Sequence, residues 1–109
     1  MVEVITGVIN EEWRSISGFP NYQISNIGRV RNHKGRIMKP ILGGDGYLRT
    51  SLNNEEIKKR SHLIHRLVAK EFIPNPNNLD VIDHIDNVKS NNTINNLRWC
   101  SLKQNQGNR

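Results

Sequence analysis

Apolar and polar residues alternate along several short stretches in the first half of the chain. Residues 22–25 and 29–32 alternate on either side of the turn-forming residues 26–28, which predicts a β-hairpin. Its second strand would place Val30 inward and Arg29 and Arg31 outward. Turns rich in glycine and asparagine separate three further predicted strands, at residues 37–40, 47–52 and 57–60. We therefore expect residues 22–62 to form a small antiparallel β-meander.

The segment before this meander has a different pattern. Residues 1–9 form an apolar-polar lead that is compatible with a strand or a loose arm. Residues 11–22 contain three aromatic side chains together with Gly18 and Pro20, which break helices. We expect a loop whose aromatic side chains pin it onto the sheet.

After residue 62, apolar residues recur every three to four positions and no longer at every second position. Apolar residues at positions 64, 67, 68 and 72 form a helical stripe that ends before two prolines. A strand is predicted over residues 80–85, a polar loop over 86–93 and a returning strand over 97–100. Ser101 is a suitable N-cap for a last helix over residues 102–108. The chain is therefore predicted to be an α+β protein, with a β-sheet region at residues 1–62 and a strand-loop-strand-helix region at residues 63–109.

Charge is unevenly distributed between these two regions. The chain has 109 residues, a formal net charge of +6, a mean hydropathy of −0.66 and a pI of about 9.9. Ten Lys or Arg face three acids between residues 14 and 60, which indicates a surface that binds a polyanion. An ordinary solvated sheet face is the alternative. The candidate DNA-binding residues are Arg29, Arg31, Arg36, Lys39, Arg49, Lys58 and Arg60.

Composition also excludes several classes of protein. The single cysteine, Cys100, rules out an internal disulfide and a cysteine-based zinc site, and we expect it to be a small buried side chain. No apolar segment is long enough to span a membrane, and no signal peptide is visible. We expect a cytoplasmic protein of one domain that needs no small-molecule cofactor.

The pair Asp83-His84 is the strongest chemical feature of the sequence. It ends a short apolar run, so a carboxylate that can bind a hard cation stands beside a general-base candidate. Metal-assisted phosphodiester hydrolysis requires this combination. Asparagine is abundant in the same region, and any one of these amides could serve only in a turn or a cap. His65 could ligate a metal, but a local hydrogen bond at the start of the helix is the favoured interpretation.

The spacing of these residues resembles the HNH nuclease motif. Asn96 follows His84 by twelve residues and Asn105 follows Asn96 by nine, as in the variant in which asparagine replaces the last histidine. Residues 65–99 resemble the HNH endonucleases of phages and group I introns. Residues 13–30 resemble the modular domain that often precedes them.

The resemblance implies a fold and a set of roles. The fold would be the ββα-metal finger, with Asp83 and Asn105 holding one Mg²⁺ or Mn²⁺ ion. His84 would be the general base. Asn96 would support catalysis by tying the loop and helping to orient the histidine.

We therefore expect a metal-dependent DNA endonuclease that acts on double-stranded DNA as a monomer or homodimer. A DNA-binding module with a vestigial nuclease site and an RNA-directed nuclease are the alternatives. Members of the family often continue into a C-terminal helix-turn-helix region, which is not seen before Arg109. A naturally short enzyme and a truncated chain are both compatible with that.

Overall fold

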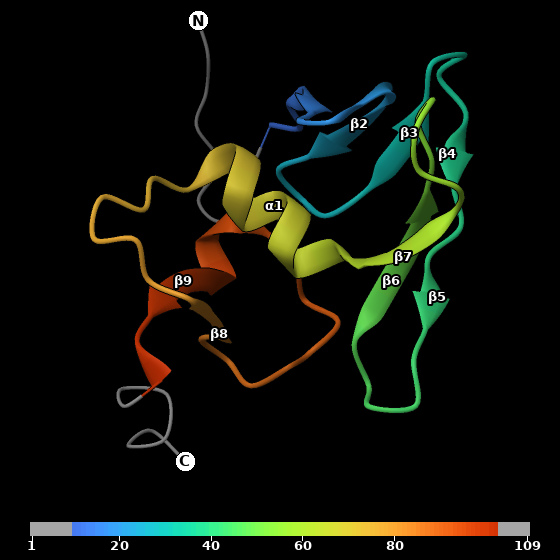
Figure 1. Ribbon diagram of the computed structural model, residues 1–109. Coiled ribbons are helices and arrows are strands. Elements are labelled where there is room, and N and C mark those ends of the chain that lie inside the picture. Colours follow the sequence, from blue (N-terminus) through green and yellow to red (C-terminus); the bar gives the residue numbers. More distant parts are fainter. Residues whose placement is uncertain (1–9, 103–109) are drawn as a thin grey trace, which may run out of the picture.

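A central helix between antiparallel strand pairs organises the protein. The computed structural model describes residues 10–102. The helix α1 (Ile64–Phe72) lies between two groups of strands (Figure 1). On one side is the pair of β8 (Val81–His84) and β9 (Leu97–Cys100), and on the other is the sheet that runs from β5 (Ile41–Leu42) to β7 (Arg60–Leu63). No helix within residues 10–102 is long and apolar enough to cross a membrane. The predicted lead at residues 1–9 and all but the first residue of the predicted last helix lie outside the described residues.

The first sheet has four antiparallel strands in the order β1-β2-β3-β4. They are β1 (Trp13–Ile16), β2 (Phe19–Ser25), β3 (Val30–Asn32) and β4 (Ile37–Met38). The predicted hairpin at residues 22–32 is confirmed, with Gln23 opposite Arg31 and with Val30 buried. The loop expected over residues 11–22 is wrong, because β1 and the start of β2 form a hairpin there. Gly18 makes its turn at φ +87°.

A second sheet contains β5 (Ile41–Leu42), β6 (Leu48–Leu52) and β7 (Arg60–Leu63). The strands of residues 22–62 are thus divided between two sheets and do not form one continuous meander. The strand predicted over residues 57–60 is also wrong, because β7 begins where that strand was expected to end. Arg60 pairs with Leu52, and the charged residues before it lie outside β6 and β7.

The helical stripe packs these sheets together. The buried face of α1 includes Ile64, Leu67 and Val68, as the apolar spacing predicts, and Phe72 is half-buried beside it. These side chains meet Ile24 and Leu52, which come from the two different sheets. One core therefore supports both the basic region and the Asp-His segment.

The last described elements form the strand-loop-strand that the sequence predicts. The strand β8 (Val81–His84) pairs with β9 (Leu97–Cys100), and a short 3₁₀ turn, η1 (Ile94–Asn96), precedes β9. Cys100 is buried, as expected. The α+β class is confirmed.

Two contacts join the loop between β8 and β9 to the first half of the chain. The backbone N–H of Ile94 donates to Asn26 O at 3.0 Å. The Lys89 ammonium donates to Asp45 O at 2.8 Å and lies over the Tyr47 ring. The loop that follows Asp83-His84 is therefore held from outside the strand pair that carries it.

Candidate active site and nucleic-acid interface

The end of β8 presents Asp83 and His84 on opposite sides of the strand, as alternation requires. The Asp83 side chain is 13% exposed and lies opposite Arg98 of β9, whose Nη2 is 3.0 Å from Asp83 Oδ2. Arg98 Nε donates to the same oxygen at 3.2 Å. Oδ1 receives no hydrogen bond from the described residues. Asp83 therefore has one carboxylate oxygen available for a further partner.

His84 is buried and has a defined hydrogen-bond partner. Only 5% of the residue is exposed, and its Nε2 lies 2.7 Å from Asn92 Oδ1. An amide oxygen only accepts hydrogen bonds, so Nε2 carries the proton in the neutral ring. Nδ1 is then the nitrogen with a free lone pair, which is the form a general base needs.

Two other rings pack against this imidazole. The ring centroids of His65 and Tyr47 lie 4.9 Å and 5.8 Å from that of His84. Burial lowers the pKa of His65 to about 4, and nearby positive charge adds to the effect. The local hydrogen bond expected for His65 is wrong, because its buried Nδ1 has no partner. His65 is therefore a neutral packing neighbour of His84.

Asn96 ties the loop as the resemblance implies. Its Nδ2 donates to Asp86 Oδ1 at 2.8 Å and to Asn91 O at 2.9 Å, while its Oδ1 accepts the Asp86 N–H at 3.0 Å. The hydrogen bonds to Asp86, first from Asn91 and then from the Val88 N–H, hold the pKa of Asp86 below its usual value. Its expected help in orienting His84 stays a prediction, and the hydrogen bond to the imidazole itself comes from Asn92.

The candidate metal site has one ligand among the described residues. No three His, Cys, Asp or Glu side chains gather as a metal site within residues 10–102. Asp83 contributes a carboxylate with an available oxygen, and its predicted partner, Asn105, lies outside the described residues. A carboxylate and an amide oxygen form a donor set that suits a hard cation such as Mg²⁺ and is poor for zinc. The donor chemistry therefore fits the predicted ion.

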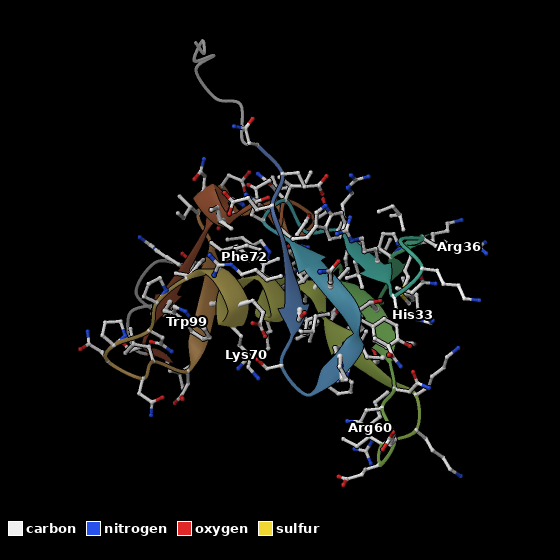
Figure 2. All side chains as sticks on the ribbon, turned by 90° about the horizontal axis from the view of Figure 1, so that it is seen from above. His33, Arg36, Arg60, Lys70, Phe72 and Trp99 are labelled. Atoms are coloured by element: carbon white, nitrogen blue, oxygen red, sulfur yellow. The ribbon has the colours of Figure 1, made fainter. Side chains whose placement is uncertain are left out.

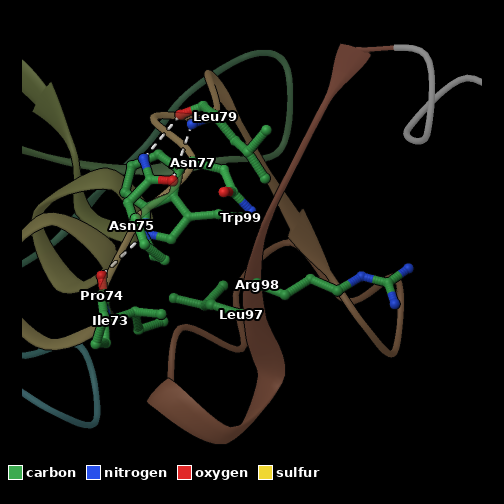
Figure 3. Close-up of a pocket in the computed structure, with 9 residues that line it drawn as sticks. Ile73, Pro74, Asn75, Asn77, Leu79, Leu97, Arg98 and Trp99 are labelled. Atoms are coloured by element: carbon green, nitrogen blue, oxygen red, sulfur yellow. Dashed lines mark hydrogen bonds between the residues drawn. The ribbon is translucent and has the colours of Figure 1, made fainter.

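Tryptophan 99 anchors the segment that leads into β8. Its Nε1 donates to Ile73 O at 3.0 Å, and the Asn75 side chain bridges the loop to Leu79. The hydrogen bonds and the groove of about 230 Å³ beside them are drawn in Figure 3. Arg98 extends away from this cluster in the same view, consistent with its contact with Asp83 on the other side of β9.

The predicted DNA-binding residues fall into two groups. Three of them have partners within the protein: Arg29 pairs with Glu11, Arg31 donates to Gln23 at 2.7 Å, and Arg49 forms an ion pair with Asp45 at 2.8 Å. Four are exposed and form no ion pair with the described residues: Arg36, Lys39, Lys58 and Arg60.

The internal partners limit what the first group can do. Arg31 Cζ lies 4.1 Å from the centroid of the Trp13 ring, and the hydrogen bond from Arg29 lowers the pKa of Glu11. Hydrogen bonds from the Arg49 guanidinium hold the pKa of Asp45 well below its usual value. These three arginines are therefore partly neutralised or stacked, and the exposed group carries the unpaired charge.

An open basic groove accompanies the exposed group. It has a volume of about 600 Å³ and runs between β4 and the segment after β6, with His33, Arg36, Lys39 and Lys59 in its lining. Its lining contains no acidic residue. His33, Arg36 and Arg60 lie toward one end of the molecule and Trp99 toward the other (Figure 2). These three basic side chains thus lie away from Trp99.

Sequence reasoning missed four residues that surround the Asp-His pair: Asn92, Tyr47, His65 as a ring neighbour, and Arg98. The partner of Asp83 could have been found, since Arg98 is placed opposite it by strand pairing. Nothing in the sequence distinguishes Asn92 from the other asparagines of its loop.

Two family models match the chain. The NUMOD4 motif matches residues 11–53, and the HNH endonuclease model matches residues 62–106. Residues 62–106 therefore match the HNH endonuclease family, and a NUMOD4 motif precedes them. The resemblance seen in the sequence, including the preceding modular domain, is confirmed.

Individual relatives agree with this assignment. The uncharacterized HNH endonuclease L245 of Acanthamoeba polyphaga mimivirus is 46% identical over 86 residues, which make up 78% of this chain and 26% of that protein. The DNA endonuclease I-HmuI of Bacillus phage SP01 is 40% identical over 96 residues, covering 86% of this chain and 55% of that enzyme.

A solved structure extends the agreement to the fold. The structure describing DNA binding and cleavage by the HNH homing endonuclease I-HmuI is 39% identical and superposes with a TM-score of 0.80. It matches 89% of this chain and 56% of that one. The chain spans about a quarter to about half of the length of these relatives.

Proposed function

We propose that this chain acts as a metal-dependent DNA endonuclease that hydrolyses phosphodiester bonds in double-stranded DNA. The Asp83-His84 pair carries the proposal. It combines a buried imidazole whose Nε2 is hydrogen-bonded with a neighbouring carboxylate that has one oxygen without a hydrogen bond from residues 10–102. The relatives support DNA as the substrate, since one of them is a DNA endonuclease.

Asp83 and Asn105 would hold one Mg²⁺ or Mn²⁺ ion. Such an ion, when bound, supplies positive charge that stabilises the transition state and the leaving oxygen of the phosphodiester. Arg98 already places a positive charge on Asp83 Oδ2, so Oδ1 would be the oxygen that faces the ion.

His84 would take the proton of the attacking water at Nδ1. Its Nε2 would remain hydrogen-bonded to Asn92 Oδ1, which stabilises the imidazolium that forms. Asn96 would act at a distance from the proton transfer by keeping the loop after His84 closed. His65 and Tyr47 would limit the access of water to the back of the ring.

The exposed basic residues would bind the phosphate backbone. Arg36, Lys39, Lys58 and Arg60 have no ion partner among residues 10–102, so they can exchange counterions for DNA phosphates. Binding should then weaken steeply as the salt concentration rises. The paired arginines could join only after giving up contacts within the protein.

Plasmid cleavage tests this proposal. Purified protein with Mg²⁺ should convert supercoiled plasmid to nicked or linear forms, and EDTA should stop it. His84→Ala and Asp83→Ala should each lower the cleavage rate by at least about a hundredfold while still shifting DNA on a gel. Asn95→Ala, which changes an exposed side chain with no hydrogen bond among the described residues, is the control and should cleave normally.

Three results would overturn it. If wild type binds plasmid without cutting it, the chain is a DNA-binding module with a vestigial site. If His84→Ala cleaves like wild type, His84 is not the base. If RNA competes for binding better than duplex DNA and is itself cleaved, the substrate class is wrong.

A further inference from the structure

The hydrogen bond between Asn92 and His84 suggests a role for Asn92, which is not one of the four predicted motif residues, Asp83, His84, Asn96 and Asn105. We propose that Asn92 is a positioning residue that fixes which nitrogen of His84 carries the proton, and that the turn at residues 26–28 holds Asn92 in place. The catalytic part of this inference rests on the proposed function. The structural part does not.

A neutral imidazole has two tautomers, and only one of them suits a given proton transfer. A ring nitrogen that already bears hydrogen cannot accept a proton from water. Asn92 Oδ1 lies 2.7 Å from His84 Nε2 and is the side-chain acceptor that meets this ring among residues 10–102. It therefore selects the tautomer in which Nδ1 is free.

The other neighbours of the ring do not make this selection. His65 and Tyr47 meet His84 through ring contacts, with no hydrogen bond to it among the described residues. Such contacts restrict where the ring lies but are indifferent to which nitrogen is protonated. Loss of the Asn92 amide would leave the ring packed and its tautomer unspecified.

Asn92 is itself seated against the N-terminal region. It is 4% exposed, and a Cβ placed on Gly28 would lie 2.9 Å from Asn92 Cβ and 3.2 Å from its backbone oxygen. Only glycine at position 28 therefore allows this approach, and its φ of +89° also favours glycine.

The turn that carries Gly28 is well braced. Asn26 O accepts the Ile94 N–H two residues beyond Asn92, and the Asn26 side chain bonds to the backbone of Asn10 and Glu12. Ser25 Oγ accepts backbone N–H groups of the same turn at 3.1 and 3.3 Å. The NUMOD4 region thus provides a hydrogen-bonded turn against which Asn92, the residue proposed to orient His84, packs.

A simpler role for Asn92 is that of a buried amide that stabilises its loop. Nitrogen-15 NMR of the His84 ring separates the two roles without relying on activity. Spectra of the metal-free protein at about pH 8 should show a single neutral tautomer with Nε2 protonated. Asn92→Ala should give averaged shifts of the two tautomers, and Asn92→Asp, which keeps an acceptor, should restore the Nε2–H form.

Asn91→Ala is the matched control. Asn91 lies in the same loop and its side chain bonds to Asp86 and Thr93, so its loss weakens the loop without touching His84. We expect it to leave the tautomer unchanged. In cleavage assays Asn92→Ala should lower kcat about ten- to a hundredfold with KM little changed, whereas Asn91→Ala should have a small effect.

The role of the turn at residues 26–28 can be tested separately. Gly28→Ala and Gly18→Ala both place a side chain at a positive φ, but nothing lies within 4 Å of the Cβ at position 18. Gly28→Ala should reproduce the averaged tautomer signal of Asn92→Ala, and Gly18→Ala should not. Equal spectra for the two glycine variants would overturn the part of the inference that concerns the turn.

The outcomes for Asn92 are equally distinct. If Asn92→Ala retains the single Nε2–H tautomer, Asn92 does not position the ring, whatever its effect on cleavage. If His84→Ala cleaves DNA normally, the proposed function fails while the tautomer measurement still decides the structural claim.

Discussion

The carboxylate of Asp83 and the guanidinium of Arg98 face each other across the β8–β9 pair, with Nη2 3.0 Å from Oδ2. The contact occupies one oxygen of the proposed metal ligand and leaves the other without a hydrogen bond from the described residues. It orients the carboxylate, and at the same time it places a positive charge where a cation would bind.

Arg98→Gln should therefore strengthen cation binding. Removing the guanidinium relieves repulsion of the cation, and the amide can still donate to Asp83 Oδ2. Half of the Arg98 side chain is exposed, so we expect the Mg²⁺ concentration for half-maximal cleavage to fall only about two- to fivefold. Magnesium titrations of the cleavage rate measure this. Arg66→Gln is the control, and an unchanged or higher Mg²⁺ requirement for Arg98→Gln would contradict the argument.

Asn96→Ala should destabilise the protein by about 2 kcal/mol, because it removes three hydrogen bonds and leaves groups of the loop unpaired. Urea denaturation followed by tryptophan fluorescence gives the value. Asn95 is exposed and its side chain makes no hydrogen bond among the described residues, so Asn95→Ala should change the free energy of unfolding by less than about 0.5 kcal/mol. Equal losses in both variants would mean that Asn96 does not tie the loop.

The free energy of unfolding should decrease as the solution becomes more acidic, because the folded protein disfavours protonation of His65. Burial lowers its pKa to about 4 in the folded protein, whereas an unfolded histidine titrates near about 6.5. As the pH falls from about 6.5 to about 4, the unfolded chain binds a proton that the folded chain does not, so this contribution is present above the window and lost within it. We expect a loss on the order of 2 kcal/mol.

Urea denaturation at several pH values, with wild type and His65→Phe, measures this contribution. The phenylalanine variant keeps a ring in the core and has no group that titrates, so its stability should depend less on pH within the same window. His33→Gln alters an exposed histidine and should retain the wild-type slope. A slope unchanged in His65→Phe would exclude His65 as the cause.

Arg36→Gln combined with Lys39→Gln should weaken DNA binding and make it less sensitive to salt. If both side chains contact phosphates, the slope of log K against log salt should decrease in magnitude by about 2. Fluorescence anisotropy with a labelled duplex gives the slope. The pair Arg66→Gln and Lys70→Gln, on the exposed side of α1, is the control; a similar change there would indicate a general effect of net charge.

Charge reversal at Arg29 and Arg31 should also reduce affinity, but it is a less specific test. Those changes break the ion pair with Glu11 and the stacking on Trp13. A loss of affinity should therefore be interpreted only beside a thermal unfolding curve for the same variant.

The sequence predicted correctly those helices and strands that can be recognised from the spacing of their own apolar residues. The apolar spacing of residues 64–72 gave α1 its bounds, and the short apolar run before the Asp-His pair gave β8. Pro20 misled the prediction of β1 and β2, since proline is tolerated near a strand end. The pairing of β2 with β3 begins only at Tyr22, so Pro20 has no ladder hydrogen bond to lose there.

The surroundings of His84 could not be predicted, because they are set by tertiary packing. Tyr47, His65 and Asn92 come from two different loops and from α1, and no short-range pattern brings them together. The division of the basic residues into paired and free groups has the same origin. Arg49 and Asp45 are four residues apart, but their contact depends on the geometry of the turn between β5 and β6.

The hydrogen bonds from Ile94 to Asn26 and from Lys89 to Asp45 constrain how this protein can be recombined. A chimera that joins residues 63–109 to a different targeting unit would keep Asp83 and His84 but lose both of these supports. Such a fusion should need the preceding strands as well. The segment that must be transferred is therefore longer than the nuclease motif. A fusion junction placed near residue 10 keeps both hydrogen bonds.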